Sequence, residues 1–189
     1  MDKQIRNIVI VGGGTAGWLT CAVIAAEHCA KSKEGLKVTL VESPDVPTVG
    51  VGEGTWPTMR GTLRKAGIHE SDFFKYCDAA FKQGAKFAKW VTGAEDDAYY
   101  HPLVLPQGYA EINLAPFWQP HADKVSFADA VSFQGQLCEH GLAPKQQSTP
   151  EYAHVANYAY HLDAGKFAAF LQQHCVNKLG AQHILDHVT

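Results

Sequence analysis

A glycine-rich turn that directly follows an apolar run constrains this chain more than any other feature. Residues 8–11 are apolar and β-branched, which predicts a strand buried on both faces of a parallel sheet. The next residues, 12–17, read GGGTAG and fit the pattern G-x-G-x-x-G. In this pattern Gly12 makes the tight turn, Gly14 lets the backbone approach a pyrophosphate, and Gly17 lets a helix pack closely on the strand.

The residues after the turn complete a βαβ unit. Thr15 and Ala16 lead into residues 18–30, which are rich in helix-forming alanine, and residues 37–41 predict a second strand that ends at Glu42. Phosphates would bind the amides at the start of the helix, and Glu42 would accept hydrogen bonds from an adenosine ribose. An acid at this position disfavours the 2′-phosphate of NADP. FAD and NAD both remain open, and a purely structural turn is the less favoured alternative.

Composition excludes several classes of protein. The chain has 189 residues, 46% of them hydrophobic, and a formal charge of −3, which describes a soluble globular protein rather than a disordered or nucleic-acid-binding one. No run has the length of a membrane span and no signal peptide is visible, so we expect a cytoplasmic location and no membrane contact. The five cysteines are scattered without a C-x-x-C motif, which predicts reduced thiols. The ten histidines show no zinc spacing, so no metal is expected.

A second glycine-rich stretch, residues 48–57, reads TVGVGEGTWP. Its glycines and Pro57 exclude a regular helix. Apolar residues that alternate with glycine suit a loop that lies flat against a ligand, because larger side chains would obstruct close approach. An ordinary surface loop is the alternative.

The remaining segments predict helices, short strands and irregular chain. Acids, aromatics and prolines with little periodicity fill residues 93–119, so residues 93–150 are predicted to form an irregular insertion. Gly67 and Gly180 are predicted to end the helices that precede them. The predicted helices are residues 55–66, 71–81, 123–138 and 167–179, and the predicted strands are residues 85–91 and 181–188.

Four stretches together resemble the flavin-dependent halogenases of the tryptophan-halogenase type. They are VGGGTAGW at residues 11–18, GVGEGTWP at 50–57, FKQGAKFAKW at 81–90 and YHLDAGKFAAFL at 160–171. The first is shared with many flavoproteins, whereas the second and third, in this order and spacing, are much more specific. The resemblance implies an α/β fold, namely a FAD-binding Rossmann-type domain of the flavin-monooxygenase kind.

The resemblance also implies how the cofactor is bound and used. Reduced FAD, supplied by a separate flavin reductase, would react with O2 and halide to give hypohalous acid. Glu42 would bind the adenosine ribose, and Val188 would lie near the adenine. The residues implied to run along the flavin are Gly50, Val51, Gly52 and Glu53.

Lys82 stands at the position of the lysine that receives the hypohalous acid in these enzymes. Its amine would hold the acid by a hydrogen bond or react with it to form a transient haloamine. Either way, an electrophilic halogen would be presented to one carbon of an aromatic ring. From composition alone a lone lysine is a solvated surface charge, and the flanking motif is what favours a function.

The substrate stretch departs from the family pattern. Tryptophan halogenases place an indole between a histidine and a phenylalanine, whereas here the stretch contains His101 and Leu103. The histidine is kept and the second aromatic face is absent. We therefore expect a small aromatic substrate, indole-like or phenol-like, with free indole or a larger aromatic favoured over tryptophan.

Two other functions and one structural expectation follow. A flavin hydroxylase or NAD-linked oxidoreductase would share only the Rossmann unit, and a truncated flavin-binding module would have no activity. The family's WxWxIP motif, catalytic glutamate and halide site lie C-terminal to residue 189. Because only two parallel strands are evident and the chain ends within a predicted strand, residues 1–189 are expected to be the N-terminal FAD-binding part of a larger domain. Alone they should bind FAD weakly, aggregate and halogenate nothing; a homodimer is left open.

Overall fold

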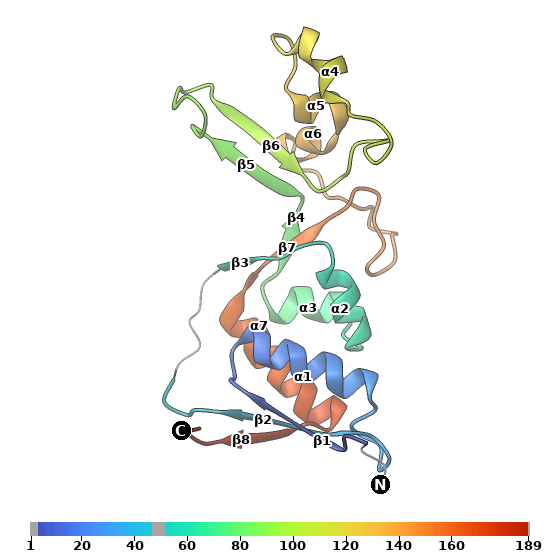
Figure 1. The fold of residues 1–189 in the computed structure, drawn as a ribbon, viewed down its shortest axis with the longest axis vertical. Coiled ribbons are helices and arrows are strands. Elements are labelled where there is room, and N and C mark those ends of the chain that lie inside the picture. The colour runs from blue at the N-terminus through green and yellow to red at the C-terminus, as the bar shows by residue number, and fades with distance from the viewer. Residues whose placement is uncertain (1–3, 47–51, 189) are drawn as a thin grey trace. The chain divides into compact units, whose positions relative to one another are not determined.

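The computed structural model describes residues 4–46 and 52–188 (Figure 1). The chain divides into two compact units, and each is described here by itself. We name them the sheet unit and the hairpin unit. The sheet unit consists of Met1–Gly54, Thr58–Ala80 and His161–Thr189, and the hairpin unit consists of Thr55–Pro57 and Phe81–Tyr160.

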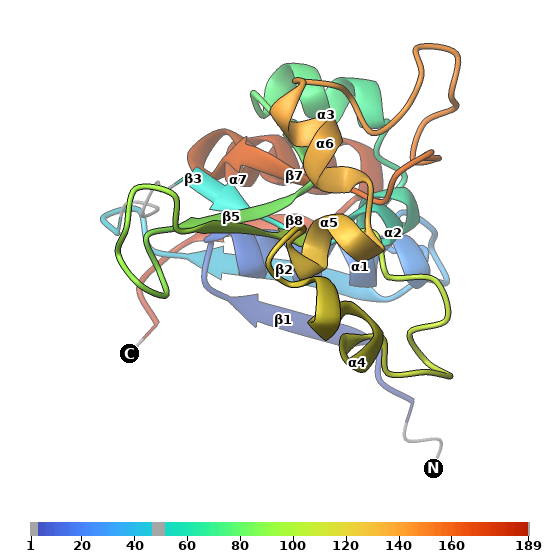
Figure 2. The ribbon, with the colours of Figure 1, turned by 90° about the horizontal axis from the view of Figure 1, so that it is seen from above.

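A parallel three-stranded sheet is the base of the sheet unit. Its order is β1 (Asn7–Val11), β2 (Lys37–Glu42) and β8 (Gln182–Leu185), and Figure 2 shows β1 and β2 pointing the same way. Leu40 of β2 pairs with both Ile10 and His183, so segments from the two ends of the chain meet on β2. The predicted strands at residues 8–11, 37–41 and 181–188 are confirmed, although β8 is shorter than predicted.

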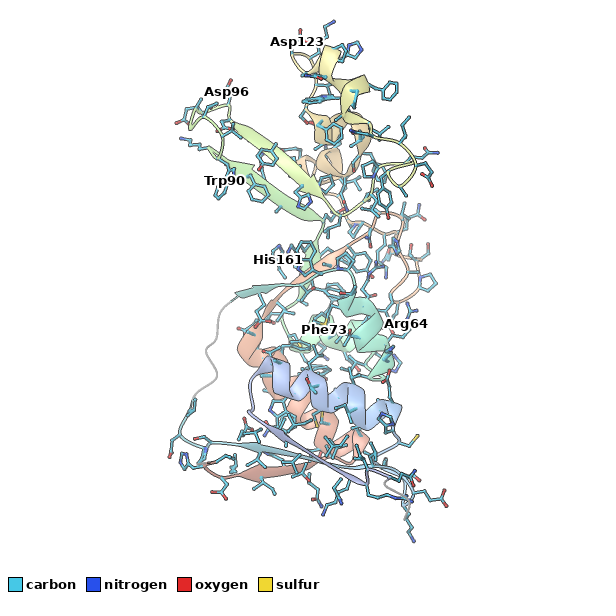
Figure 3. The ribbon with its side chains drawn as sticks, in the orientation of Figure 1. Arg64, Phe73, Trp90, Asp96, Asp123 and His161 are labelled. Carbon is cyan, nitrogen blue, oxygen red and sulfur yellow. The ribbon has the colours of Figure 1, made fainter. Side chains whose placement is uncertain are left out.

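Helices α1 (Thr15–Glu27) and α7 (Ala164–His174) lie on the same face of this sheet (Figure 1). Helix α7 continues as a π-helical turn, η2 (Cys175–Leu179), which ends at Gly180 with φ of +78°, as predicted. Helices α2 (Met59–Lys65) and α3 (Glu70–Tyr76) complete the unit. Phe73 of α3 points into the interior (Figure 3), where its ring packs edge-on against Phe167 with centroids 5.3 Å apart. The predicted stop at Gly67 is also confirmed, with φ of +70°.

The prediction that residues 8–11 are buried on both faces is wrong. Alternate side chains of β1 are exposed, and Val9 and Val11 each have 63% of their surface accessible. The physical reason is that β1 lies at the edge of the sheet and the helices cover one face. In the described residues the opposite face of β1 has no covering layer.

The helices predicted after residue 54 differ from the observed ones in their boundaries. The helix predicted at 71–81 ends at Tyr76, because Asp78 adopts φ of +47°, a left-handed conformation that turns the chain before β4 (Ala80–Lys82). The helix predicted at 167–179 begins earlier, at Ala164, because the Asp163 carboxylate caps it by accepting a hydrogen bond from the Lys166 backbone N–H at 2.8 Å. The helix predicted at 55–66 is the shorter α2.

A second sheet has the order β3 (Gly52–Gly54), β7 (Ala159–Asp163) and β4. Strands β3 and β7 are antiparallel, with Glu53 opposite Leu162. This pairing gives the GEG part of the second glycine-rich stretch an extended conformation. Residues 48–51 of that stretch lie outside the described residues.

The hairpin unit is built on an antiparallel pair of strands, β5 (Gly84–Ala88) and β6 (Ala98–Pro102). Trp90 and Asp96 lie in the segment that connects the two strands (Figure 3). The strand predicted at 85–91 corresponds to β5. The segment predicted as irregular, residues 93–150, contains β6 and several short helices. The helix predicted at 123–138 is broken at Ser132, whose backbone is extended. The short helices are α4 (Ala115–Trp118), η1 (Gln119–His121), α5 (Phe127–Val131) and α6 (Gln134–Glu139).

Among the described residues, none of the helices combines the length and the apolar character that a membrane crossing requires.

Candidate functional site

The glycine turn between β1 and α1 has the geometry that its sequence predicts. Gly12 has φ of +113°, a conformation that favours glycine, and its N–H donates to the Val41 carbonyl at 2.8 Å. A Cβ atom at Gly17 would overlap the Gly12 carbonyl. The turn and the close approach of α1 to β1 therefore both require glycine.

The start of α1 is open to a ligand. Gly14 is the N-cap residue and gives the helix no side-chain cap, and a Cβ atom built at Gly14 meets nothing within 4 Å. The first backbone N–H groups of a helix have no partner within it, and the helix dipole makes this end positive. An anionic group can therefore reach the backbone here, as a pyrophosphate would require.

The turn opens into a cavity of about 670 Å³ in the sheet unit. A cavity of this size is suitable for a ligand the size of a nucleotide. Glu53 of β3 and Val188 from the end of the chain contribute to its walls. The predicted cofactor residues that line it are Gly12, Gly14, Thr15, Ala16, Glu42, Glu53 and Val188. Gly17, which was also predicted, is not among the residues that line it. Gly52, also predicted, lies on β3, and Gly50 and Val51 fall outside the described residues.

Glu42 ends β2 at the cavity and is fixed on two sides. Its Oε1 atom lies 2.7 Å from Nε2 of His183, and both side chains are about one-fifth exposed, at 20% and 18%. A Cβ atom at Gly13 would overlap the Glu42 carboxyl group. The sequence pattern treats position 13 as variable, but here only glycine leaves room for the acid.

Asp186 and His187, which follow β8, also line the cavity, and sequence reasoning missed them. The backbone N–H of Asp186 donates to the Glu42 carbonyl at 2.9 Å. The His187 ring lies between Ser43 and Asp45, with Nδ1 3.2 Å from the Ser43 hydroxyl and Nε2 2.9 Å from the Asp45 carboxylate. The carboxyl ends of parallel strands meet at one edge of a sheet, and this rule could have placed these residues had β8 been paired with β2 in advance.

Lys82 belongs to the hairpin unit and is held at short range. Its Nζ donates to the Thr55 carbonyl at 3.2 Å and lies 5.2 Å from the centre of the Trp56 ring. Thr55 is itself anchored, because its N–H donates to the Tyr160 carbonyl at 2.8 Å and its hydroxyl accepts from the Tyr160 N–H at 3.0 Å. The amine is thus half-buried between a fixed carbonyl and an aromatic ring.

The two predicted substrate residues differ in exposure. His101 is exposed on β6, opposite Ala85. Leu103 is buried, and its backbone N–H donates to the Gln83 carbonyl at 3.3 Å, which brings its backbone close to the residue that follows Lys82. Whether either residue contacts a substrate stays a prediction.

All five cysteines are free, as the sequence predicted. Burial raises the pKa of the Cys77 thiol to about 12, and the neighbouring Asp163 and Asp78 carboxylates add to the effect. Cys21 and Cys175 are buried together, and their mutual hydrogen bond lowers the pKa of Cys21 and raises that of Cys175. In their protonated form Cys77 and Cys175 are poor nucleophiles.

The glycine turn, the acid on the neighbouring parallel strand and the cavity at their edge define a Rossmann-type fold for binding a dinucleotide. The tryptophan halogenase family matches residues 7–189, and the chain belongs to this family.

Relatives with known names and solved structures agree with this placement. The chain is 31% identical to tryptophan 6-halogenase ThaL of Streptomyces albogriseolus and 31% identical to tryptophan 7-halogenase RebH of Lentzea aerocolonigenes, with all of this chain covered in both cases. The structure of a tryptophan halogenase from Shewanella frigidimarina is 52% identical, with a TM-score of 0.89 over the whole chain. That of Xcc4156, a flavin-dependent halogenase from Xanthomonas campestris, is 32% identical over 98% of the chain, with a TM-score of 0.80.

The chain spans about two-fifths of the length of these relatives: 38% of ThaL, 37% of RebH, 38% of the Shewanella protein and 36% of the Xanthomonas protein.

Proposed function

We propose that this chain is the FAD-binding, lysine-bearing part of a flavin-dependent halogenase that acts on a small aromatic compound. The observation that carries the proposal is the convergence of the glycine turn, the start of α1 and Glu42 on one cavity. Membership of the tryptophan halogenase family supports the halogenase activity, and the family's named relatives support an aromatic substrate.

The residues at the cavity fit the adenosine half of FAD. Gly14 leaves space for a pyrophosphate at the start of α1, and Glu42 offers acceptors to a ribose. The apolar side chains of Val46 and Val188, which also line the cavity, suit an adenine. We therefore assign the phosphates to residues 12–16 and the ribose to Glu42.

Bound reduced FAD would supply the electrons with which O2 converts halide to hypohalous acid. Delivery of reduced FAD by a separate flavin reductase is part of the proposal. The task of this chain in that step is to hold the dinucleotide by its phosphates and ribose.

Lys82 would act on the hypohalous acid. In one route its amine donates a hydrogen bond to the acid and orients the halogen. In the other, the amine nitrogen forms a bond to the halogen, and the amine proton leaves with the hydroxide as water. An aromatic carbon then takes the halogen, and the proton lost from that carbon returns to the amine. The Thr55 carbonyl and the Trp56 ring limit the directions in which the amine can point.

The test compares two lysines of the hairpin unit in the full protein. Lys82→Ala should leave FAD binding unchanged and lower halogenation of indole by more than about a hundredfold, because the electrophile is no longer held at the substrate. Lys86→Ala is the control, since Lys86 forms a surface ion pair with Glu139 at 2.6 Å. Halogenation that survives in Lys82→Ala would contradict the role of Lys82. Oxygenated product formed without halide would show a hydroxylase instead.

A further inference from the structure

We propose that His183 is a positioning residue for the dinucleotide: it holds the Glu42 carboxylate in place for the adenosine ribose, and Gln172 holds the His183 ring. This inference rests on the proposed role of Glu42 in ribose binding. It assigns a function to three side chains in contact with one another, Gln172, His183 and Glu42, none of which is adjacent in sequence to another.

The pairing of two strands places His183 beside Glu42. Leu40 of β2 pairs with His183 of β8, and Glu42 follows two residues after Leu40. Side chains two residues apart on a strand share a face of the sheet, so His183 and Glu42 point to the same side. The resulting distance between Nε2 and Oε1 is 2.7 Å, with both side chains mostly covered.

Gln172 of α7 holds the other side of the His183 ring. Its amide nitrogen Nε2 lies 3.1 Å from Nδ1 of His183. An amide nitrogen can only donate, so Nδ1 is the acceptor of this contact. Gln172 and Glu42 therefore lie against the two nitrogen atoms of one ring.

The histidine ring has little freedom to leave this position. Trp18 of α1 is 1% exposed, and its ring meets the His183 ring edge-on with centroids 5.1 Å apart. On the other side of the carboxylate, Gly13 leaves space that a larger residue would fill. Elements β8, α7 and α1 thus fix the histidine, and the histidine fixes the acid.

The carboxylate keeps its capacity to bind a ribose. A carboxylate accepts about four hydrogen bonds, so a single contact with His183 leaves acceptors for ribose hydroxyls. Holding the side chain in its binding conformation before the ligand arrives removes an entropy cost of binding. Loss of His183 should therefore weaken only the part of the affinity that comes from the ribose hydroxyls.

The experiment measures the affinity that comes from the ribose hydroxyls. The full protein is titrated calorimetrically with ADP and with 2′,3′-dideoxy-ADP. The wild type should prefer ADP by about tenfold or more. His183→Leu should lose most of this preference with an unchanged affinity for the dideoxy nucleotide. His183→Gln should keep part of it, because its amide can contact Glu42 in place of the imidazole. His121→Ala, an exposed histidine of the hairpin unit, should match the wild type.

Each result decides the matter. A preference for ADP in His183→Leu that equals the wild-type preference would overturn the inference. An equal loss of affinity for both nucleotides would also overturn it, because such a loss would show a role in folding alone. A wild type that does not distinguish the nucleotides would instead contradict the ribose role of Glu42 within the proposed function. If His183→Leu does not fold, Gln172→Met replaces it: the inference predicts a smaller fall in the preference, and no fall would overturn it.

Discussion

The two units of the molecule differ in the interactions that stabilise each of them internally. In the sheet unit, the apolar side chains on one face of β1 and β2 pack against two helices, and β1, α1 and β2 follow one another in the chain. In the hairpin unit, single polar side chains connect segments that are far apart in the chain. Gln134 is fully buried; its Oε1 accepts from the backbone N–H groups of Leu103 and Val104, both at 2.7 Å, and its Nε2 donates to the Asn157 carbonyl at 2.6 Å.

This difference affects how each unit responds to change. A unit built on many apolar contacts loses stability gradually, whereas one that depends on a few buried polar anchors loses it abruptly when an anchor is removed. The candidate dinucleotide site lies in the sheet unit, which depends on apolar contacts. Lys82 lies in the hairpin unit, which depends on buried polar anchors. The following predictions test this contrast, beginning with the largest effect.

Gln134→Leu should destabilise the hairpin unit by roughly 3 kcal/mol, because the Val104 N–H and the Asn157 carbonyl lose a buried partner. Faster amide exchange at Val104, with unchanged ADP binding by the sheet unit, is the expected result. Gln136→Leu, an exposed change on the same helix, is the control. Equal effects of the two substitutions would remove the contrast between the units.

Gly17→Ala should destabilise the sheet unit by about 1–3 kcal/mol, because the new methyl group overlaps the Gly12 carbonyl. Gly14→Ala adds its methyl group to open space and should keep the fold while weakening nucleotide binding. Thermal unfolding and ADP titration measure the two effects separately. If Gly14→Ala unfolds the protein as strongly as Gly17→Ala, the open start of α1 is not a ligand site.

Trp56→Leu should remove the cation–π interaction that restrains the Lys82 amine. Such an interaction contributes about 0.5–1 kcal/mol at an exposed site. Acylation of Lys82, followed by peptide mass spectrometry, should become roughly two- to fivefold faster, and Trp56→Phe should show a smaller change. Lys86 in the same sample is the internal reference. An unchanged rate at Lys82 would show that Trp56 does not constrain the amine.

The smallest effect is expected at the end of the hairpin. Backbone N–H groups of Gly93, Thr92 and Val91 donate to the Asp97 carboxylate and lower its pKa below the ordinary value of 3.8. A lowered pKa in the folded state means that the stabilisation is present above pH 3.8 and is lost as the pH falls through the folded value. Asp97→Asn should therefore differ from the wild type at neutral pH and not in strong acid. Amide chemical shifts of residues 91–93 against pH would measure this, and a difference independent of pH would contradict it.

The sequence allowed most of the sheet unit to be predicted. The pattern G-x-G-x-x-G between a strand and a helix predicts a phosphate-binding turn, with an acid at the end of the next strand. Gly12, Gly14 and Glu42 could therefore be assigned to one site in advance. The role of His183 could not, because it depends on the contact of β2 with a strand about 140 residues later in the chain. That of Gly13 depends on the conformation of the Glu42 side chain. Local pattern carries no information on such a partner.

The hairpin unit was less predictable for a physical reason. Its anchors are single residues, and a buried glutamine such as Gln134 has no periodic pattern that would distinguish it from exposed ones such as Gln136. The segment around Lys82 was predicted as a helix end, because Phe81 continues the helical spacing of Phe73 and Cys77. The left-handed backbone of Asp78 overrides that spacing and places Lys82 on a strand.

The central claim is that the cavity at the edge of β1 and β2 holds FAD. The most direct measurement is a calorimetric titration of the full protein with FAD and, separately, with NAD, in the wild type and in Gly14→Ala. The account predicts that FAD binds more tightly than NAD and that Gly14→Ala weakens FAD binding without unfolding the protein. Binding of NAD with no binding of FAD, or FAD binding that Gly14→Ala leaves unchanged, would contradict it.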